Sequence, residues 1–90
     1  MTQKEKLSYL IKKYKEGEYV TKTFCDEFVR IFYYEKDGSM TYKELDNLNK
    51  FTETFSRFSP YPEDVKSGFL FGEDRINQEF KELLKGWKEL

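Results

Sequence analysis

The sequence predicts an all-α, single-domain protein, an antiparallel four-helix bundle that spans residues 1–90. Apolar residues recur every three or four positions in four separate stretches, and turn-forming residues divide those stretches. A chain of 90 residues is long enough for one domain, and two of the three connections are short, which favours antiparallel neighbours. The expected elements are helices at about residues 3–16, 23–36, 41–58 and 73–88, with an ordered loop over residues 59–72.

The first helix is predicted from a single stripe of apolar side chains. Four residues have the spacing i, i+3, i+4 and i+7 that places them on one helix face: Leu7, Leu10, Ile11 and Tyr14. Gly17 follows as a stop signal, because glycine commonly ends helices.

The second helix is predicted to start after Thr23, with Thr23 as N-cap and Asp26 in the position of a capping-box acid. The turn signal Asp37-Gly38 ends it. Its stripe comprises Phe24, Phe28, Ile31 and Phe32, widened by Cys25 and Val29.

The third helix begins with a second capping-box pattern, Thr41 followed by Glu44. Its stripe runs through Leu45, Leu48, Phe51, Phe55 and Phe58. Pro60 and Pro62 end it, because a residue before proline is disfavoured in helical geometry.

The loop over residues 59–72 has no helical period but is rich in apolar side chains, so we expect it to fold against the helices. Its expected anchors are Tyr61, Val65, Phe69, Leu70 and Phe71. The last helix has acids at its start and lysines near its end, which suits the helix dipole. Its stripe comprises Ile76, Phe80, Leu83, Leu84 and Trp87.

Composition excludes several classes of function. The chain has no histidine, which excludes His-based catalysis and His metal sites, and its single cysteine excludes an internal disulfide and a Cys-cluster zinc site. We interpret Cys25 as a small core residue. No apolar run approaches 18 residues, so neither a membrane span nor a signal peptide is expected, and the protein is predicted to be cytoplasmic.

Three local patterns resemble catalytic or ligand sites, but each has a simpler structural explanation. Adjacent acids such as Glu63 and Asp64 do not face each other on a helix, so they make no catalytic dyad. Residues 35–44 are similar to the end of a calcium loop, but Tyr33 stands where the first carboxylate ligand is required. Gly68 and Gly72 precede a helix whose acidic first turn would repel a phosphate. We therefore expect no enzymatic activity, no metal and no cofactor.

The charge is unevenly distributed along the chain. Residues 1–22 contain six lysines and three acids, whereas residues 23–80 contain twelve acids and seven bases. An acidic middle argues against direct binding of nucleic acid and is compatible with a basic partner protein, or simply with an ordinary solvated surface. Tyr33, Tyr34 and Tyr61 are candidates for a protein interface, because tyrosine is enriched there.

The chain reads FSRFSPYPED over residues 55–64, then FLF over residues 69–71 and INQEFKELL over residues 76–84. This segment resembles the colicin D immunity protein family and related immunity proteins of colicin-like and contact-dependent-inhibition toxins. The Arg-Phe-x-Pro turn of that family is present as Arg57, Phe58 and Pro60, followed by acids. The literal match covers residues 51–84.

The resemblance implies a protein that binds a cognate toxin nuclease 1:1, typically a tRNA-cleaving ribonuclease, and covers its active site with an acidic surface. Serines and a tyrosine stand at three positions where a family member carries acids, so the location of the surface transfers but the individual contacts do not. The expected toxin-binding residues are Glu53, Ser56, Arg57, Ser59, Tyr61, Glu63 and Asp64. The sequence predicts no oligomeric state for the free protein. The alternative is a non-enzymatic helical adaptor or regulatory domain for another basic protein.

Overall fold

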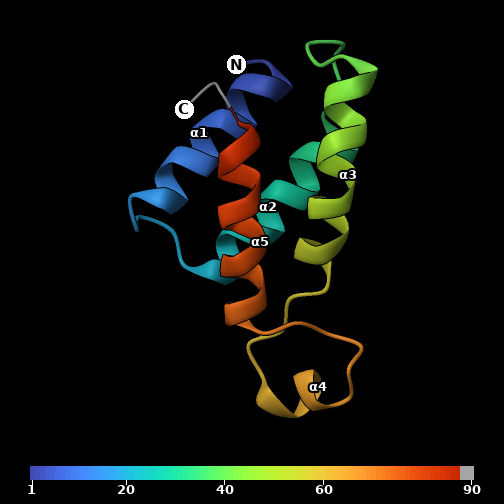
Figure 1. Ribbon diagram of the computed structural model, residues 1–90. Helices are drawn as coiled ribbons and strands as arrows, with labels where there is room; N and C mark the ends of the chain where they lie inside the picture. Colours follow the sequence, from blue (N-terminus) through green and yellow to red (C-terminus); the bar gives the residue numbers. More distant parts are fainter. Residues whose placement is uncertain (88–90) are drawn as a thin grey trace.

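The computed structural model describes residues 1–87, and over that range the chain is all-helical and forms a single globule (Figure 1). A short helix, α4 (Pro62–Lys66), lies at one end of the molecule, beyond the ends of α3 and α5 (Figure 1). Helix α1 packs on α2, α2 on α3, and α3 on α5. The four long helices are α1 (Gln3–Lys15), α2 (Thr21–Tyr34), α3 (Tyr42–Ser56) and α5 (Glu73–Gly86).

The core is built around aromatic rings from all four long helices. Phe24 of α2 stacks on Tyr14 with ring centroids 4.2 Å apart. The same ring meets Phe55 and Phe80 edge-on, with centroids at 5.2 Å and 5.3 Å. Such pairs add about 0.5–1.5 kcal/mol each beyond the burial of their apolar area. Cys25 is buried in this core, as the sequence predicts.

The N-cap of α2 was predicted three residues too late. Val20 is the N-cap and offers no side-chain hydrogen bond, while the expected N-cap Thr23 lies inside the helix. The cause is tertiary: Thr21 is buried, its hydroxyl group donates to the Glu73 carboxylate of α5, and it lies 2.9 Å from the Tyr14 hydroxyl of α1. By contrast, the predicted capping box at the start of α3 is confirmed.

The four long helices end one or two residues before their predicted last residues. Helix α5 ends at Gly86, and Trp87 follows with extended backbone, whereas residue 88 lies outside the described residues. Helix α3 ends at Ser56 because the next residues pair with the far end of the loop. The Phe71 amide donates to the Arg57 carbonyl at 2.8 Å, and the Ser59 amide donates to the Phe71 carbonyl at 2.9 Å.

These two hydrogen bonds close residues 59–71 into a ring that contains α4 (Figure 1). The predicted ordered loop therefore contains a short helix that the sequence reading did not foresee. Val65, Leu70 and Phe71 are half-buried, as anchors should be. Phe69 and Tyr61 are not anchors, because they are 75% and 59% exposed.

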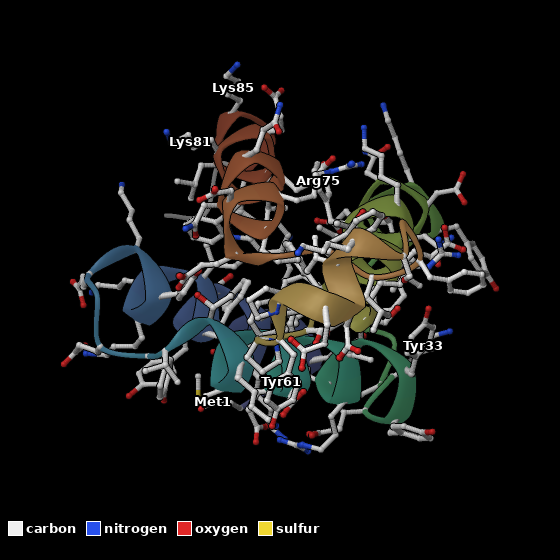
Figure 2. The ribbon with its side chains drawn as sticks, turned by 90° about the horizontal axis from the view of Figure 1, so that it is seen from below. Met1, Tyr33, Tyr61, Arg75, Lys81 and Lys85 are labelled. Atoms are coloured by element: carbon white, nitrogen blue, oxygen red, sulfur yellow. The ribbon has the colours of Figure 1, made fainter. Side chains whose placement is uncertain are left out.

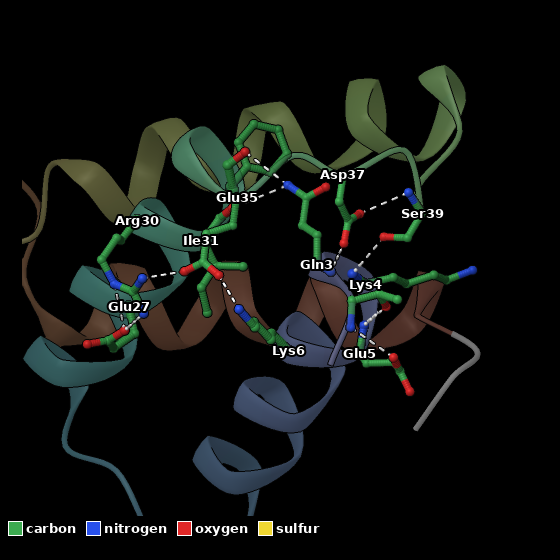
Figure 3. A network of polar contacts seen from close by, with 12 residues as sticks. Gln3, Lys4, Glu5, Lys6, Glu27, Arg30, Ile31, Glu35, Asp37 and Ser39 are labelled. Carbon is green, nitrogen blue, oxygen red and sulfur yellow. Dashed lines mark hydrogen bonds and ion pairs between the residues drawn. The ribbon is translucent and has the colours of Figure 1, made fainter.

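A buried glutamine joins α1 to the end of α2 (Figure 3). The Gln3 side chain is 2% exposed, and its Nε2 donates to the carbonyls of Ile31 and Phe32 at 3.2 Å and 3.1 Å. The Gln3 backbone amide donates to Asp37 Oδ2 at 2.9 Å. Hydrogen bonds with Ser39 and with this amide hold the pKa of Asp37 below its ordinary value.

The Gln3 and Asp37 hydrogen bonds form a polar clasp between α1 and the α2–α3 connection. Next to this clasp, the Glu35 carboxylate forms ion pairs with Lys6 of α1 and Arg30 of α2 (Figure 3). The hydrogen bond from Lys6 and then that from Arg30 lower the pKa of Glu35. The polar clasp therefore holds the first turn of α1 on the α2–α3 connection, at the end of the molecule opposite α4 (Figure 1).

Candidate protein-binding site

The part of the molecule around α4 carries a group of carboxylates without ion-pair partners. Within residues 1–87, none of the five acids between positions 53 and 74 forms an ion pair, and that segment contains only two basic residues. Most other acids are paired, for example Asp26 with Lys22 at 2.7 Å and Glu79 with Arg75 at 3.2 Å. The five acids are Glu53, Glu63, Asp64, Glu73 and Asp74.

Ser59 fixes the turn that leads into α4. Its side chain is buried, its Oγ donates to Asp64 Oδ2 at 2.8 Å, and the same Oγ accepts the Tyr61 amide at 3.2 Å. The Asp64 amide in turn donates to the Tyr61 carbonyl at 3.1 Å, and Pro62 occupies the first helical turn. Because proline fixes its own φ angle, the turn is rigid on both sides of Tyr61.

Tyr61 is displayed by this turn rather than packed into the core. Figure 2 shows it on the side of α4 that faces the start of α2. Its ring and Val20, which is 70% exposed, border a hollow of about 390 Å³. A rigid aromatic side chain with a polar tip is typical of protein interfaces, because it offers a large contact area and loses little entropy on binding.

The seven residues expected from the sequence occupy different environments. Five of them are exposed: Glu53, Ser56, Arg57, Tyr61 and Glu63. Asp64 is half-buried, and Ser59 is buried with its hydroxyl group engaged inside the loop. The structure joins Ser59, Tyr61 and Asp64 by direct hydrogen bonds. The hydrogen bond from the Phe71 amide to the Arg57 carbonyl joins the end of α3 to the loop.

The structure adds Val20, Lys22 and Glu73 to this surface, which sequence reasoning did not include. All three border the same hollow as Tyr61, although they come from the starts of α2 and α5. The only local sign in the sequence that Val20 belongs to this surface is that it is an isolated apolar residue next to a helix start. Val20 lines the hollow because the folded chain brings the α4 turn beside it.

The single cysteine of the chain lies in the core and not at this surface. Burial raises the pKa of the Cys25 thiol to about 12, so this cysteine is protonated at neutral pH and is a poor nucleophile. No cluster of three or more potential metal ligands occurs in residues 1–87. In the same range, no helix has the length and apolar character needed to cross a membrane.

No protein-family model matches this chain, and comparisons with curated proteins and with solved structures found no significant match. This surface offers carboxylates without ion-pair partners, one exposed tyrosine and a shallow hollow, and it is formed by the α4 loop together with the end of α3 and the starts of α2 and α5.

Proposed function

We propose that this chain is a non-enzymatic immunity protein that binds a cognate toxin nuclease and blocks its active site. The observation that carries the proposal is the set of unpaired carboxylates around the rigid α4 turn. A nuclease has cations in its cleft to hold phosphates. Carboxylates without intramolecular ion pairs are attracted to such a cleft and compete for the same cations.

Rigidity supports the proposal, because a preorganised surface loses little conformational entropy on binding. The backbone pairing of residues 57–59 with Phe71 and the Ser59 hydrogen bonds supply that rigidity. As part of the same proposal, the four long helices form an antiparallel bundle that serves as the support for the loop.

In this proposal, Glu53 and Glu63 pair with cations of the nuclease, and Tyr61 is the aromatic anchor between them. Arg57 is exposed and has no ion-pair partner among residues 1–87, so it is available to a carboxylate of the nuclease. The complex is 1:1 and forms in the cytoplasm, and the nuclease is a tRNA-cleaving ribonuclease. The resemblance of residues 51–84 to immunity proteins supports these details.

The proposal predicts that a nuclease domain is encoded beside this gene, and the test measures tRNA cleavage by that domain in the presence of this chain. One equivalent of the wild-type chain is expected to stop cleavage, and Glu63→Lys is expected to restore it. Asp46→Lys is the matched control, because Asp46 is also exposed and unpaired but lies in the first half of α3, far from α4. Equal inhibition by both variants would place the binding surface elsewhere.

One observation favours the alternative of a helical adaptor. Tyr33, Tyr34 and Tyr42 are exposed where α2 ends and α3 begins, at the end of the molecule opposite α4 (Figure 1). Two exposed aromatic surfaces suit a protein that joins two partners. An adaptor would bind its basic partner without inhibiting any nuclease, so the cleavage assay separates the two functions.

A further inference from the structure

The hollow beside Tyr61 has walls from two distant parts of the chain. Val20 and Lys22 come from the start of α2, and Tyr61 and Val65 come from the α4 turn. Its volume of about 390 Å³ lies at the small end of the usual range for ligand pockets. The exposed Val20 and Tyr61 side chains make its entrance apolar and aromatic.

The hollow has a net negative charge, because the one lysine that lines it is already paired with an aspartate. Lys22 lies at the edge of the hollow, but Asp26 holds its ammonium group at 2.7 Å. The hydrogen bond to Asp26 is the main cause that raises the pKa of Lys22, and the Tyr61 phenol makes a smaller contribution. The remaining charge is the carboxylate of Glu73, which has no ion-pair partner among residues 1–87.

We propose that this hollow receives one arginine or lysine side chain of the partner protein. The aliphatic stem packs between Val20 and the Tyr61 ring, and the cationic head group lies against the ring face and the Glu73 carboxylate. Long basic side chains combine an apolar stem with a charged tip, which matches an apolar entrance with one carboxylate. A cation over a tyrosine ring is attracted by the ring quadrupole.

This inference rests on the proposed function, since it names the part of the basic partner that enters the surface. It also explains why Glu73 is left without a cation: the hollow in front of it holds no basic side chain of this chain other than the paired Lys22. An acidic side chain would meet Glu73 across the same hollow and be repelled.

The experiment is a titration of the isotope-labelled protein with a capped hexa-arginine peptide, followed by the NMR shifts of backbone amides. The largest saturating shifts are expected at Val20, Tyr61 and Glu73, and a hexa-glutamate peptide is expected to cause none there. Tyr61→Ala and Glu73→Gln are expected to weaken binding by about threefold to fivefold each, the size of exposed cation–π and ion-pair contributions. Glutamine keeps an oxygen that accepts the Thr21 hydrogen bond, so Glu73→Gln preserves the helix junction.

Asp74→Asn is the matched control, because Asp74 is the next residue along, is exposed and unpaired, and does not border the hollow. It should weaken binding by less than about twofold. The inference would be overturned if the amide shifts were spread evenly over all acidic residues. It would also be overturned if Glu73→Gln and Asp74→Asn weakened peptide binding equally. If the neighbouring nuclease is not bound while hexa-arginine still shifts these amides, the proposed function fails and the hollow remains a basic-side-chain site.

Discussion

Replacement of Ser59 by alanine tests how the turn before α4 is held. The side chain is 5% exposed, and its Oγ forms one hydrogen bond to a carboxylate and accepts one from a backbone amide. A hydrogen bond to a charged group contributes about 1.5–3 kcal/mol to the free energy of unfolding, and one between neutral groups contributes about 0.5–1.5 kcal/mol. Because Asp64 is half-buried, water replaces part of the first bond, so we expect a loss of about 2 kcal/mol.

The assay is urea unfolding combined with hydrogen exchange of the Tyr61 amide, which loses its acceptor in Ser59→Ala. A loss of 2 kcal/mol corresponds to about 30-fold faster exchange. Ser67→Ala is the control: its hydroxyl donates to the Asp64 carbonyl at 2.7 Å and accepts the Phe69 amide at 3.3 Å, but it is exposed. It should cost less than about 0.5 kcal/mol. Equal effects of the two variants, or unchanged exchange at Tyr61, would refute this description of the turn.

Three further predictions concern the rest of the fold. Gln3→Ala should lower the free energy of unfolding, measured in urea, by about 2–3 kcal/mol, because two carbonyls of α2 lose the buried side-chain amide that donates to them. An unchanged free energy of unfolding would show that these hydrogen bonds do not stabilise the fold. Glu35, Asp37 and Glu44 have pKa values below their ordinary values, so stability should be complete above about pH 5 and decline as pH falls below about 4. Urea unfolding at pH 7, 4 and 3 measures this, and a constant midpoint would argue against it. Cys25 should react with a thiol reagent at pH 8 only after unfolding, and rapid labelling of the native protein would show that it is not buried.

The long helices were predictable because their signals are local. The apolar stripe of α5 has the helical period, and the capping box formed by Thr41 and Glu44 is visible within four residues of sequence. The start of α2 was not predictable in the same way. Thr21 is helical and buried because Tyr14 and Glu73 surround its hydroxyl group, and these residues are distant in sequence.

The site was predicted in part. Tyr61 was expected both as an anchor of the loop and as a candidate interface residue, and its exposure shows that the anchor prediction was wrong. The burial of Ser59 was not predicted, because it depends on the Asp64 carboxylate across the turn. Helix α4 has only five residues, too few to show a helical period. The contribution of Val20 depends on how the loop packs against α2, which no local pattern reports.

The proposed inhibition requires this surface to occupy the positions where the nuclease holds RNA phosphates. Its most direct test is displacement of a fluorescent anticodon-loop RNA from a catalytically inactive form of the neighbouring nuclease domain. The proposal predicts that one equivalent of this chain releases all the bound RNA and that Glu53→Lys/Glu63→Lys releases none. A stable ternary complex of nuclease, RNA and this chain would contradict it.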